Sequence, residues 1–505
     1  MSSLQPLALA NGESAPRDAV PIADLPALRS FVVQRVRQGG QLYSLHALPT
    51  QGQPRLLACV GVPESGSIEL ACAELPDRFP SITTECTAAH WFERELAEQW
   101  GVVPEGHPWL EPIRFHASRR TGHDAWGRAP GDIEIGRRAF WKVEGDEVHE
   151  VAVGPVHAGV IEPGHFRFQC HGETVFHLEV SLGYQHRGAE QSLVGTPGPR
   201  AMAVAETLAG DTTIGHATAW TSVLEALAGV TVPPRAEAIR AIALELERLA
   251  NHTGDLGALA GDVAYLPTAS FCGRLRGDLL NMTASLCGSR FGRGLVRPGG
   301  VAFDIDETLA RDLTARLDAV MKDVSQAVNL LWDKPSVMAR FEGMGALSRQ
   351  LAIDLGLVGP AARACGLEHD IRADFPVGHY RFSQVPVSTW DTGDVFARAF
   401  VRWLEIQRAA EFVRDGLSAL PEGSVRAESR SPRPNRIAVA LVEGWRGAIC
   451  HVAVTDQQGD IEHAKVVDPS FHNWIGLAMA LRNNPISEFP LCNKSFNLSY
   501  CGHDL

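Results

Sequence analysis

The segment Ala201–Trp220, AMAVAETLAGDTTIGHATAW, opens a long helical part of the chain. Its apolar residues recur on a wide face, and this pattern predicts one helix over Pro199–Ala228. Further helices of the same kind are predicted at Arg235–Leu259, Glu307–Leu331, Gly393–Leu417 and Phe471–Leu481. Wide apolar faces are typical of helices buried in a bundle, so this part of the sequence predicts a large helical bundle.

Strands are predicted on both sides of this helical segment. Before it, FVVQRV (31–36), QLYSLHAL (41–48), RLLACVGV (55–62) and SIELACAEL (67–75) are short strand candidates, and ECTAAHWFERELAEQW (85–100) predicts a helix. HFRFQCHGETVFHLEV (165–180) predicts a hairpin, and residues 437–467 predict a further strand pair near the end.

These elements divide the chain into four parts. Residues 1–20 are expected to be a disordered start, residues 21–116 an α+β module, and residues 117–147 a polar linker rich in Arg and Gly. Residues 148–505 are expected to form one domain in which a β segment precedes the helices. The predicted fold class is therefore α+β, with an N-terminal α/β module, a β segment and a large buried helical bundle.

Charge and cysteine spacing exclude several kinds of site. The chain has 46 Lys and Arg against 59 Asp and Glu, a net charge of −13, whereas a nucleic-acid partner favours a basic face. None of the ten cysteines forms a C-x-x-C pair, so the spacing predicts neither an iron–sulfur nor a zinc site. Scattered thiols in apolar runs are typical of the cytoplasm. No apolar run reaches the ~18–20 residues of a membrane helix, and the start lacks the basic region of a signal peptide.

The segment WFERELAEQWGVVPEGHPWL, which begins at Trp91, resembles the signature of the C-type, or 30-kilodalton-type, subunit of NADH:quinone oxidoreductase (complex I). The matching residues are Glu93, Arg94, Glu95, Gly101, Glu105, Gly106, His107 and Pro108. In that family the module is a docking piece. The resemblance therefore implies a docking role, not a catalytic one, for residues 21–116.

From Val151 onward the chain resembles the D-type subunit of complex I and, more closely, the large subunit of membrane-bound, energy-converting (group 4) [NiFe]-hydrogenases. The matching motifs are GPVHAGVIEPGHFRF (154–168), GYQHRGAE (183–190), LELERLANHTGDLGALAGDV (244–263), RPGGV (297–301), RACGLEHDIR (363–372) and VEGWRG (442–447). A fusion of C-type and D-type modules in one chain is similar to the large subunit of formate hydrogenlyase.

The chain departs from this family where its metals bind. The family pattern R-x-C-G-x-C-x-x-x-H keeps His216 here but has Ala209 and Thr212 in place of the cysteines, and the final C-x-x-C keeps Cys501 but has Leu498. Soft thiolates hold nickel and iron in such centres, and one thiolate does not replace four. We therefore expect no metal and no other cofactor on this chain. No G-x-G-x-x-G follows a strand, so no NAD site is expected either.

The resemblance places Glu190 and His216 beside the vacated centre. In the related enzymes the matching Glu carries protons away from the metals, and a buried Glu190 with a raised pKa would keep that role. The alternative is a structural ion pair, with Arg187 as the first candidate partner.

Arg446 resembles the arginine that lies above the hydrogenase metals. A buried guanidinium needs a carboxylate partner, for which Asp370 and Asp468 are candidates, and a purely structural ion pair is the alternative to a catalytic role. The vacated centre is expected to leave a polar, water-filled cavity lined by Glu190, His216, Arg446 and His157.

His157, Glu162 and His165 lie close together on a turn-rich segment. Since His titrates near neutral pH, these residues are candidates for a proton relay, and a hydrogen-bond network that only braces the loop is the alternative.

The resemblance implies a peripheral-arm subunit of a membrane-bound oxidoreductase complex, on the cytoplasmic side of the inner (plasma) membrane. It would couple electron transfer from an iron–sulfur cluster in a partner protein to proton or ion movement. The expected partners are a small iron–sulfur protein of the complex I B type, together with antiporter-like and H-type membrane proteins. A non-catalytic structural connector is the alternative. An active hydrogenase or NADH:quinone oxidoreductase is disfavoured by the missing thiolates and by the absence of a quinone-binding Tyr between Tyr184 and Tyr265.

Overall fold

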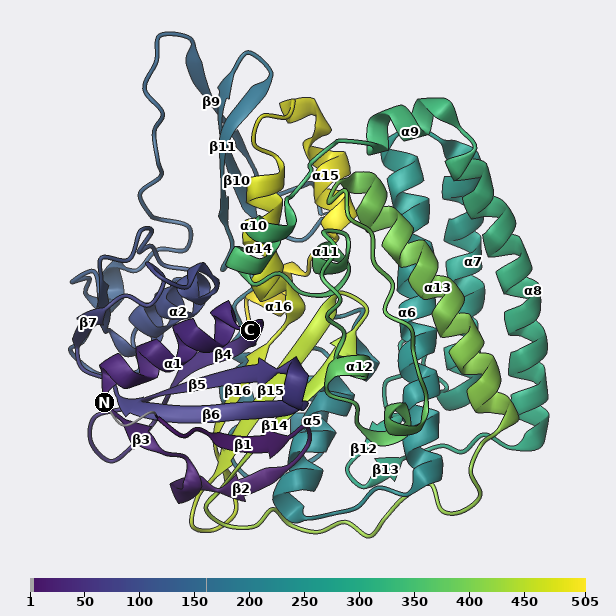
Figure 1. Ribbon diagram of the computed structural model, residues 1–505, viewed down its shortest axis with the longest axis horizontal. Helices are drawn as coiled ribbons and strands as arrows, with labels where there is room; N and C mark the ends of the chain where they lie inside the picture. The colour runs from purple at the N-terminus through teal and green to yellow at the C-terminus, as the bar shows by residue number, and fades with distance from the viewer. Residues whose placement is uncertain (1–3, 160) are drawn as a thin grey trace.

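The N-terminal module is built on a five-stranded sheet, drawn in purple and blue in Figure 1. The computed structural model describes residues 4–159 and 161–505. The strand order is β1 (Leu7–Ala10), β6 (Ser67–Glu74), β5 (Arg55–Val62) and β4 (Gln41–Leu48), with β3 (Ile22–Ala23) parallel to β6. Helices α1 (Leu25–Arg37) and α2 (His90–Trp100) accompany the sheet. The predicted α+β class is confirmed.

Residues 31–36 lie in helix α1, so the strand prediction for FVVQRV is wrong. Asp24 caps this helix, because its Oδ1 accepts a hydrogen bond from the Ala27 amide at 2.7 Å. The buried residues follow helical spacing: Leu28, Phe31, Val32 and Val33. Packing of this face against the sheet outweighs the strand propensity of Phe and Val.

The start of the chain is ordered from residue 4 onward, so the predicted disorder over 1–20 is wrong there; residues 1–3 lie outside the described residues. β1 pairs with β6, and β2 (Ser14–Pro16) pairs with β14 (Arg436–Gly444) near the other end of the sequence. Between the two strands, the buried Asn11 donates from Nδ2 to the carbonyl oxygens of Phe375 and Leu441 at 2.8 and 2.9 Å. These bonds hold the start of the chain in place.

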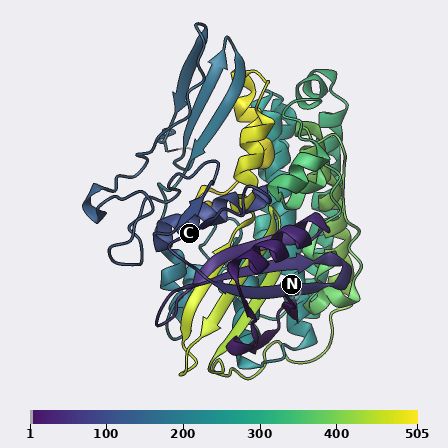
Figure 2. The same ribbon diagram turned by 60° about the vertical axis from the view of Figure 1, so that its left-hand side comes forward.

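A second sheet lies between the module and the helices (Figures 1 and 2). Its strand order is β16 (Ile461–Val467), β15 (Gly447–Thr455), β14 and β2, so residues 437–467 form three strands and not the predicted pair. Side chains alternate along β14: Ile437, Val439 and Leu441 belong to the core of the N-terminal module, and Ala438, Ala440 and Val442 to the core of the helices. Both faces of this sheet are therefore buried.

The helical layer on the right of Figure 1 contains α6, α7, α8 and α13, with α5 packed on the second sheet. The long helices are α5 (Thr213–Ala228), α6 (Pro234–Asp262), α7 (Leu266–Cys287), α8 (Glu307–Trp332), α13 (Val395–Ser418) and α14 (Pro469–Ala480). Helix α7 is not among the predicted helices, because Gly273, Gly277 and several short polar residues interrupt its apolar pattern. No helix within the described ranges combines the length and the apolar composition that crossing a membrane requires.

The helix predicted over 199–228 is broken into α4 (Pro199–Ala205) and α5. Residues 206–212 form a loop between them, and this loop carries the two vacated ligand positions. Glu206 ends α4 with a helical backbone, and its Oε1 accepts hydrogen bonds from the Gly294 amide at 2.8 Å and from Arg297 Nη1 at 2.6 Å.

The predicted hairpin over 165–180 is present as β10 (His165–His171) and β11 (Thr174–Ser181), with β9 (Val148–Val153) as a third strand. It projects at the top of Figures 1 and 2. The remaining short strands and α-helices are β7 (Arg78–Pro80), β8 (Val103–Glu105), β12 (Val296–Arg297), β13 (Gly300–Val301), α3 (Ala189–Ser192), α9 (Pro335–Phe341), α10 (Arg349–Leu355), α11 (Gly359–Arg363), α12 (Ile371–Asp374), α15 (Phe489–Phe496) and α16 (Tyr500–His503).

Candidate functional site

The loop before α5 and the C-terminal segment meet at Arg446, which lies in the turn from β14 to β15. Its Nη1 and Nη2 donate to Oδ1 and Oδ2 of Asp211 at 2.6 and 2.8 Å, and its Nε donates to the carbonyl oxygen of Asn497 at 2.5 Å. The guanidinium carbon lies 3.8 Å from the centre of the Trp445 ring. One side chain therefore joins the two segments that hold metals in the family of the resemblance.

Asp211, and neither of the two predicted residues, is the partner of Arg446. Burial alone would lower the pKa of Arg446, but the Asp211 carboxylate raises it above its ordinary value. The pKa of Asp211 is lowered, since Arg446 outweighs the effect of burial. Asp370 pairs with Arg372 instead, and Asp468 pairs with His216. Both groups of the Arg446–Asp211 pair are therefore charged at neutral pH.

The residues at the four ligand positions do not fit a nickel–iron centre. Ala209 and Leu498 are buried and offer no ligand atom, and the hydroxyl of Thr212 accepts a hydrogen bond from Arg446 Nη1 at 3.3 Å. Burial raises the pKa of the remaining thiol, Cys501, to about 11, so it is protonated at neutral pH. Among the described residues, no group of three or more His, Cys, Asp or Glu side chains is placed to hold a metal ion.

His216 lies in a row of three buried polar side chains. Its Nε2 is 3.0 Å from Oδ2 of Asp468, and its Nδ1 is 3.1 Å from Nε2 of His451. Helix α5 presents His216, and Asp468 also caps α14 by accepting from the Ser470 amide. Burial would raise the pKa of Asp468, but its bond to His216 and the charge of Arg446 lower it. Burial lowers the pKa of His451 well below its ordinary value, so this ring is neutral and the row holds the His216 ring by hydrogen bonds on both sides.

Glu190 is fixed in an ion pair, and the expectation of a raised pKa is wrong. Its Oε1 accepts from Lys465 Nζ at 2.8 Å, and the same ammonium group binds Glu95 at 2.6 Å. Burial alone would raise the pKa of Glu190, but the charges of Lys465 and Arg114 lower it far below its ordinary value. Arg187 is not the partner, because it donates to backbone carbonyl oxygens. The geometry favours the structural alternative for Glu190.

Near the vacated centre, the carboxyl group of Glu247 on α6 has a strongly raised pKa. The sequence motif that contains Glu247 assigns it no role. Its two oxygens accept from the Ile214 and Gly215 amides at 2.7 and 3.2 Å, at the start of α5. No cation pairs with it among the described residues. Burial therefore raises the pKa of Glu247 to about 8. A lone Glu within a helix motif gives no sequence signal of this environment.

The three candidate residues between β9 and the start of β10 bond to different groups. His157 Nε2 lies 2.9 Å from the Gly164 carbonyl oxygen, and His165 Nδ1 lies 3.3 Å from the Gly154 carbonyl oxygen. Both bonds brace the loop. Glu162 instead accepts from Gln185 at 3.1 Å and lies beside Cys501, where its charge helps to raise the pKa of the thiol.

The expected cavity gains no support from the pockets in the described part of the chain. The walls of the three best-formed pockets there contain none of Glu190, His216, Arg446 or His157, so the water-filled cavity stays a prediction. Glu190 pairs with Lys465, His216 with Asp468, and Arg446 with Asp211.

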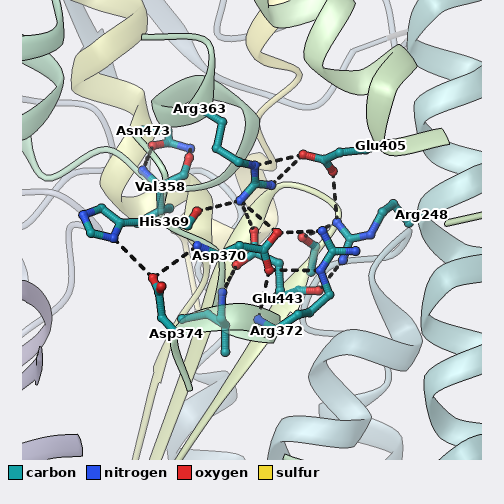
Figure 3. Close-up of polar contacts among 12 residues, drawn as sticks. Arg248, Val358, Arg363, His369, Asp370, Arg372, Asp374, Glu405, Glu443 and Asn473 are labelled. Carbon is teal, nitrogen blue, oxygen red and sulfur yellow. Dashed lines mark hydrogen bonds and ion pairs between the residues drawn. The ribbon is translucent and has the colours of Figure 1, made fainter. Parts of the chain in front are cut away.

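A second buried network lies beside this site, shown in Figure 3. Arg363 Nη1 donates to Oε1 of Glu443 at 2.9 Å, and its Nη2 lies 2.7 Å from Oε1 of Glu405. Arg372 binds Asp370, and both Arg372 and Arg248 bind Glu245 on α6. Most of these residues come from the resemblance motifs, but their spacing in the sequence does not reveal that they form one cluster.

Comparison with known proteins agrees with this architecture. Residues 56–124 match the family model of the respiratory-chain NADH dehydrogenase 30 Kd subunit, and residues 262–437 match that of the 49 Kd subunit. Formate hydrogenlyase subunit 5 of Escherichia coli (strain K12) is 30% identical over 437 residues, which cover 84% of this chain and 76% of that protein. The chain belongs to the complex I 30 Kd/49 Kd subunit family.

Other members of the complex I 30 Kd/49 Kd family show the same relationship. Hydrogenase-4 component G of Escherichia coli (strain K12) is 29% identical, with 84% of this chain and 75% of that protein covered. The C/D subunit of NADH-quinone oxidoreductase from Gluconacetobacter diazotrophicus is 29% identical, with 72% and 64% covered. The predicted resemblance is confirmed, and the family comprises peripheral-arm subunits of complex I and of group 4 hydrogenases. Its members are parts of multi-subunit assemblies.

Proposed function

We propose that this chain is a peripheral-arm subunit of a membrane-bound oxidoreductase complex that moves protons or ions without a nickel–iron centre. The observation that carries the proposal is the Arg446–Asp211 pair. It joins the two ligand-bearing segments of the family at the place where three of the four thiolate positions are Ala209, Thr212 and Leu498. The chain keeps the arrangement of these two segments, but it lacks the thiolate ligands that a nickel–iron centre would need to activate hydrogen.

Proton handling is supported by the groups that surround this pair. The row of Asp468, His216 and His451 and the carboxyl of Glu247 are buried, and burial holds the pKa of Glu247 at about 8, close to neutral pH. A buried carboxyl group with a pKa near neutral, such as that of Glu247, can change protonation in response to a nearby charge. Electrons would come from an iron–sulfur cluster in a small partner protein of the complex I B type. Antiporter-like and H-type partners would anchor the chain on the cytoplasmic side of the membrane.

A structural connector is the competing function, and the ion pairs of Glu190 favour it for that residue. The two functions predict different effects of the substitution Glu247→Gln on growth. Glutamine keeps the size of the side chain but cannot ionise.

A complementation experiment separates them. In cells whose growth depends on the complex, the Glu247→Gln chain is compared with the unaltered chain and with a surface control, Glu428→Gln. The proposal predicts normal yield of the assembled complex with loss of growth for Glu247→Gln only. Growth that falls only in proportion to complex yield, or that does not fall, supports the connector.

A further inference from the structure

The fully buried charged side chains around Arg363, most of which are labelled in Figure 3, have unequal numbers of charges. Three guanidinium groups, from Arg248, Arg363 and Arg372, face four carboxyl groups, from Glu245, Asp370, Glu405 and Glu443. All seven side chains are at most 3% exposed. His252 touches Glu405 but is neutral, because burial lowers its pKa. Every carboxyl group touches an arginine, but the arginines are fewer by one than the carboxyl groups, and an uncompensated buried charge is costly.

Among these four carboxyl groups, Glu443 is the one whose pKa lies above its ordinary value. Burial alone would raise the pKa of every carboxyl group in the network. Arginine charges overcome this effect and lower the pKa at Glu245, Asp370 and Glu405. The groups that face Glu443 are Arg363 of α11, Asp370 and Arg372 of the α12 segment, Arg248 of α6 and Tyr43 of β4. Burial, aided by the Asp370 charge, raises the pKa of Glu443 to about 7 in spite of these arginines.

A small cavity lies beside Glu443. Its volume is about 60 Å³, and its wall includes Thr218, Glu237, Tyr380 and Glu443. The Thr218 hydroxyl is buried and has no hydrogen-bond partner among the described residues. Glu237, Tyr380 and Glu443 in this wall carry polar side chains, so water in a space of this size would have hydrogen-bond partners. We call this space the inner cavity.

The inner cavity adjoins a larger pocket of about 840 Å³, which we call the outer pocket. The two share Ser222, Glu237, Val377, His379 and Leu441 in their walls. The outer pocket also includes the exposed residues Glu13 and Phe382, and the latter is 85% exposed. It therefore faces solvent, and the shared residues mark the passage inward.

Glu237 stands in this passage, in the first turn of α6. Its carboxylate lies so close to Gly378 that a Cβ added there would come within 2.4 Å of Oε2. Within residues 4–159 and 161–505 it has neither an ion-pair partner nor a hydrogen-bond partner. Burial raises its pKa above the ordinary value, although the charges of Arg240 and Arg381 face it together with that of Glu225. A carboxylate in the wall of both spaces can take a proton on one side and give it up on the other.

We propose that the inner cavity is a proton inlet, in which Glu237 takes a proton from the outer pocket and water passes it to Glu443. Glu237 is ionised again when the proton leaves, and the Glu443 carboxylate becomes a neutral carboxylic acid. No electron moves in this step. The inlet rests on the proposed function for its biological use, because it would be an entrance for the protons that the complex moves.

Infrared spectroscopy of the full-length chain tests the inlet without an activity assay. The spectrum should contain a protonated-carboxyl band that titrates at about pH 7 and is absent in Glu443→Gln. Glu443→Asp should shift this band, which covers the case in which Glu443→Gln does not fold. After rapid transfer to heavy water, Glu237→Gln should slow the deuteration of the band by about a hundredfold. Glu13→Gln, which alters a carboxylate of the outer pocket only, should leave the rate unchanged.

Two results would overturn the inlet: a spectrum in which neither Glu443 variant changes a protonated-carboxyl band, or deuteration in Glu237→Gln at the unaltered rate. Failure of the proposed function is a separate outcome. Exchange through Glu237 combined with normal growth of cells carrying Glu247→Gln would keep the inlet and reject the proton role of the complex. Loss of growth in Glu247→Gln combined with unaltered exchange in Glu237→Gln would reject the inlet and keep the proton role of the complex.

Discussion

Arg446 and Asp211 form a two-point ion pair, with Nη1–Oδ1 and Nη2–Oδ2 distances of 2.6 and 2.8 Å, between the two segments that carry metal ligands in the family. Asp211 lies between the vacated positions Ala209 and Thr212, and Asn497, which Arg446 also binds, precedes Leu498. A charged pair therefore ties together the segments that thiolates and metals would otherwise link.

Asp211→Asn should destabilise the chain, because it leaves the Arg446 guanidinium buried without a counter-charge. We expect a loss of about 1–3 kcal/mol in the free energy of unfolding, less than for a fully buried pair because the Asp211 side chain is 33% exposed. Urea unfolding measures the change. The double variant Asp211→Asn/Arg446→Met should recover part of the loss. Unaltered stability of Asp211→Asn would show that the pair does not hold these segments.

Lys465→Met should be more damaging, since it leaves the buried Glu95 and Glu190 carboxylates side by side without their shared cation. We expect a loss of about 3–5 kcal/mol. Adding Glu190→Gln to the same chain should recover part of it, because one of the two facing charges is then removed. Thermal or urea unfolding of both variants gives the comparison. A double variant no more stable than Lys465→Met would contradict the structural role of Glu190.

Glu247 should make stability fall as the pH rises. Burial raises its pKa in the folded chain from 4.5 to about 8, so between these values the folded chain keeps a proton that the unfolded chain releases. The stabilisation is complete below the ordinary pKa and is lost as the pH approaches about 8, at up to about 1.4 kcal/mol per pH unit. In Glu247→Gln this contribution should disappear, so the stability of the variant relative to the unaltered chain should increase with pH across this window. Urea unfolding at a series of pH values measures both slopes, and parallel slopes would contradict the raised pKa.

Asn11→Ala tests the ordered start of the chain. The Asn11 amide donates two hydrogen bonds, and its Oδ1 accepts one from the Leu441 amide at 2.7 Å, so the alanine variant leaves buried backbone groups unpaired. The expected loss is about 1–3 kcal/mol in urea unfolding. Asp18→Asn, an exposed change in the same region, serves as the control. Equal stability of the two variants would mean that residues 7–16 contribute little to the fold.

Much of the fold could be predicted from local pattern. The strands at 41–48 and 55–62 and the helices α6, α8 and α13 follow clear periodicity, and their ends lie within a few residues of the prediction. Helix α1 escapes prediction because Phe and Val favour strands locally, while a cap and a buried face make the segment helical. The ordered start escapes it because its partners, β6 and β14, are distant in the sequence.

The sequence predicts which residues belong to the site, but it does not predict which of them bond to one another. Motifs identify Arg446 and His216, whereas their partners Asp211 and Asp468 depend on how two distant segments meet. The sign of the Glu190 pKa shift cannot be inferred from local sequence, because it is set by Lys465 on β16. The pKa of Glu247 likewise depends on burial at the start of a helix that is distant in sequence.

The central claim is that this subunit has the fold of its family and functions in its complex without a nickel–iron centre. Nickel tests it most directly, because iron is also expected in the clusters of a partner protein. The complex is purified under reducing, oxygen-free conditions from cells supplied with nickel, and nickel per chain is measured by elemental analysis. The account predicts nickel at background level, equal to that of the Cys501→Ser variant, whose single thiol is removed. Close to one nickel per chain, lost in Cys501→Ser, would contradict it.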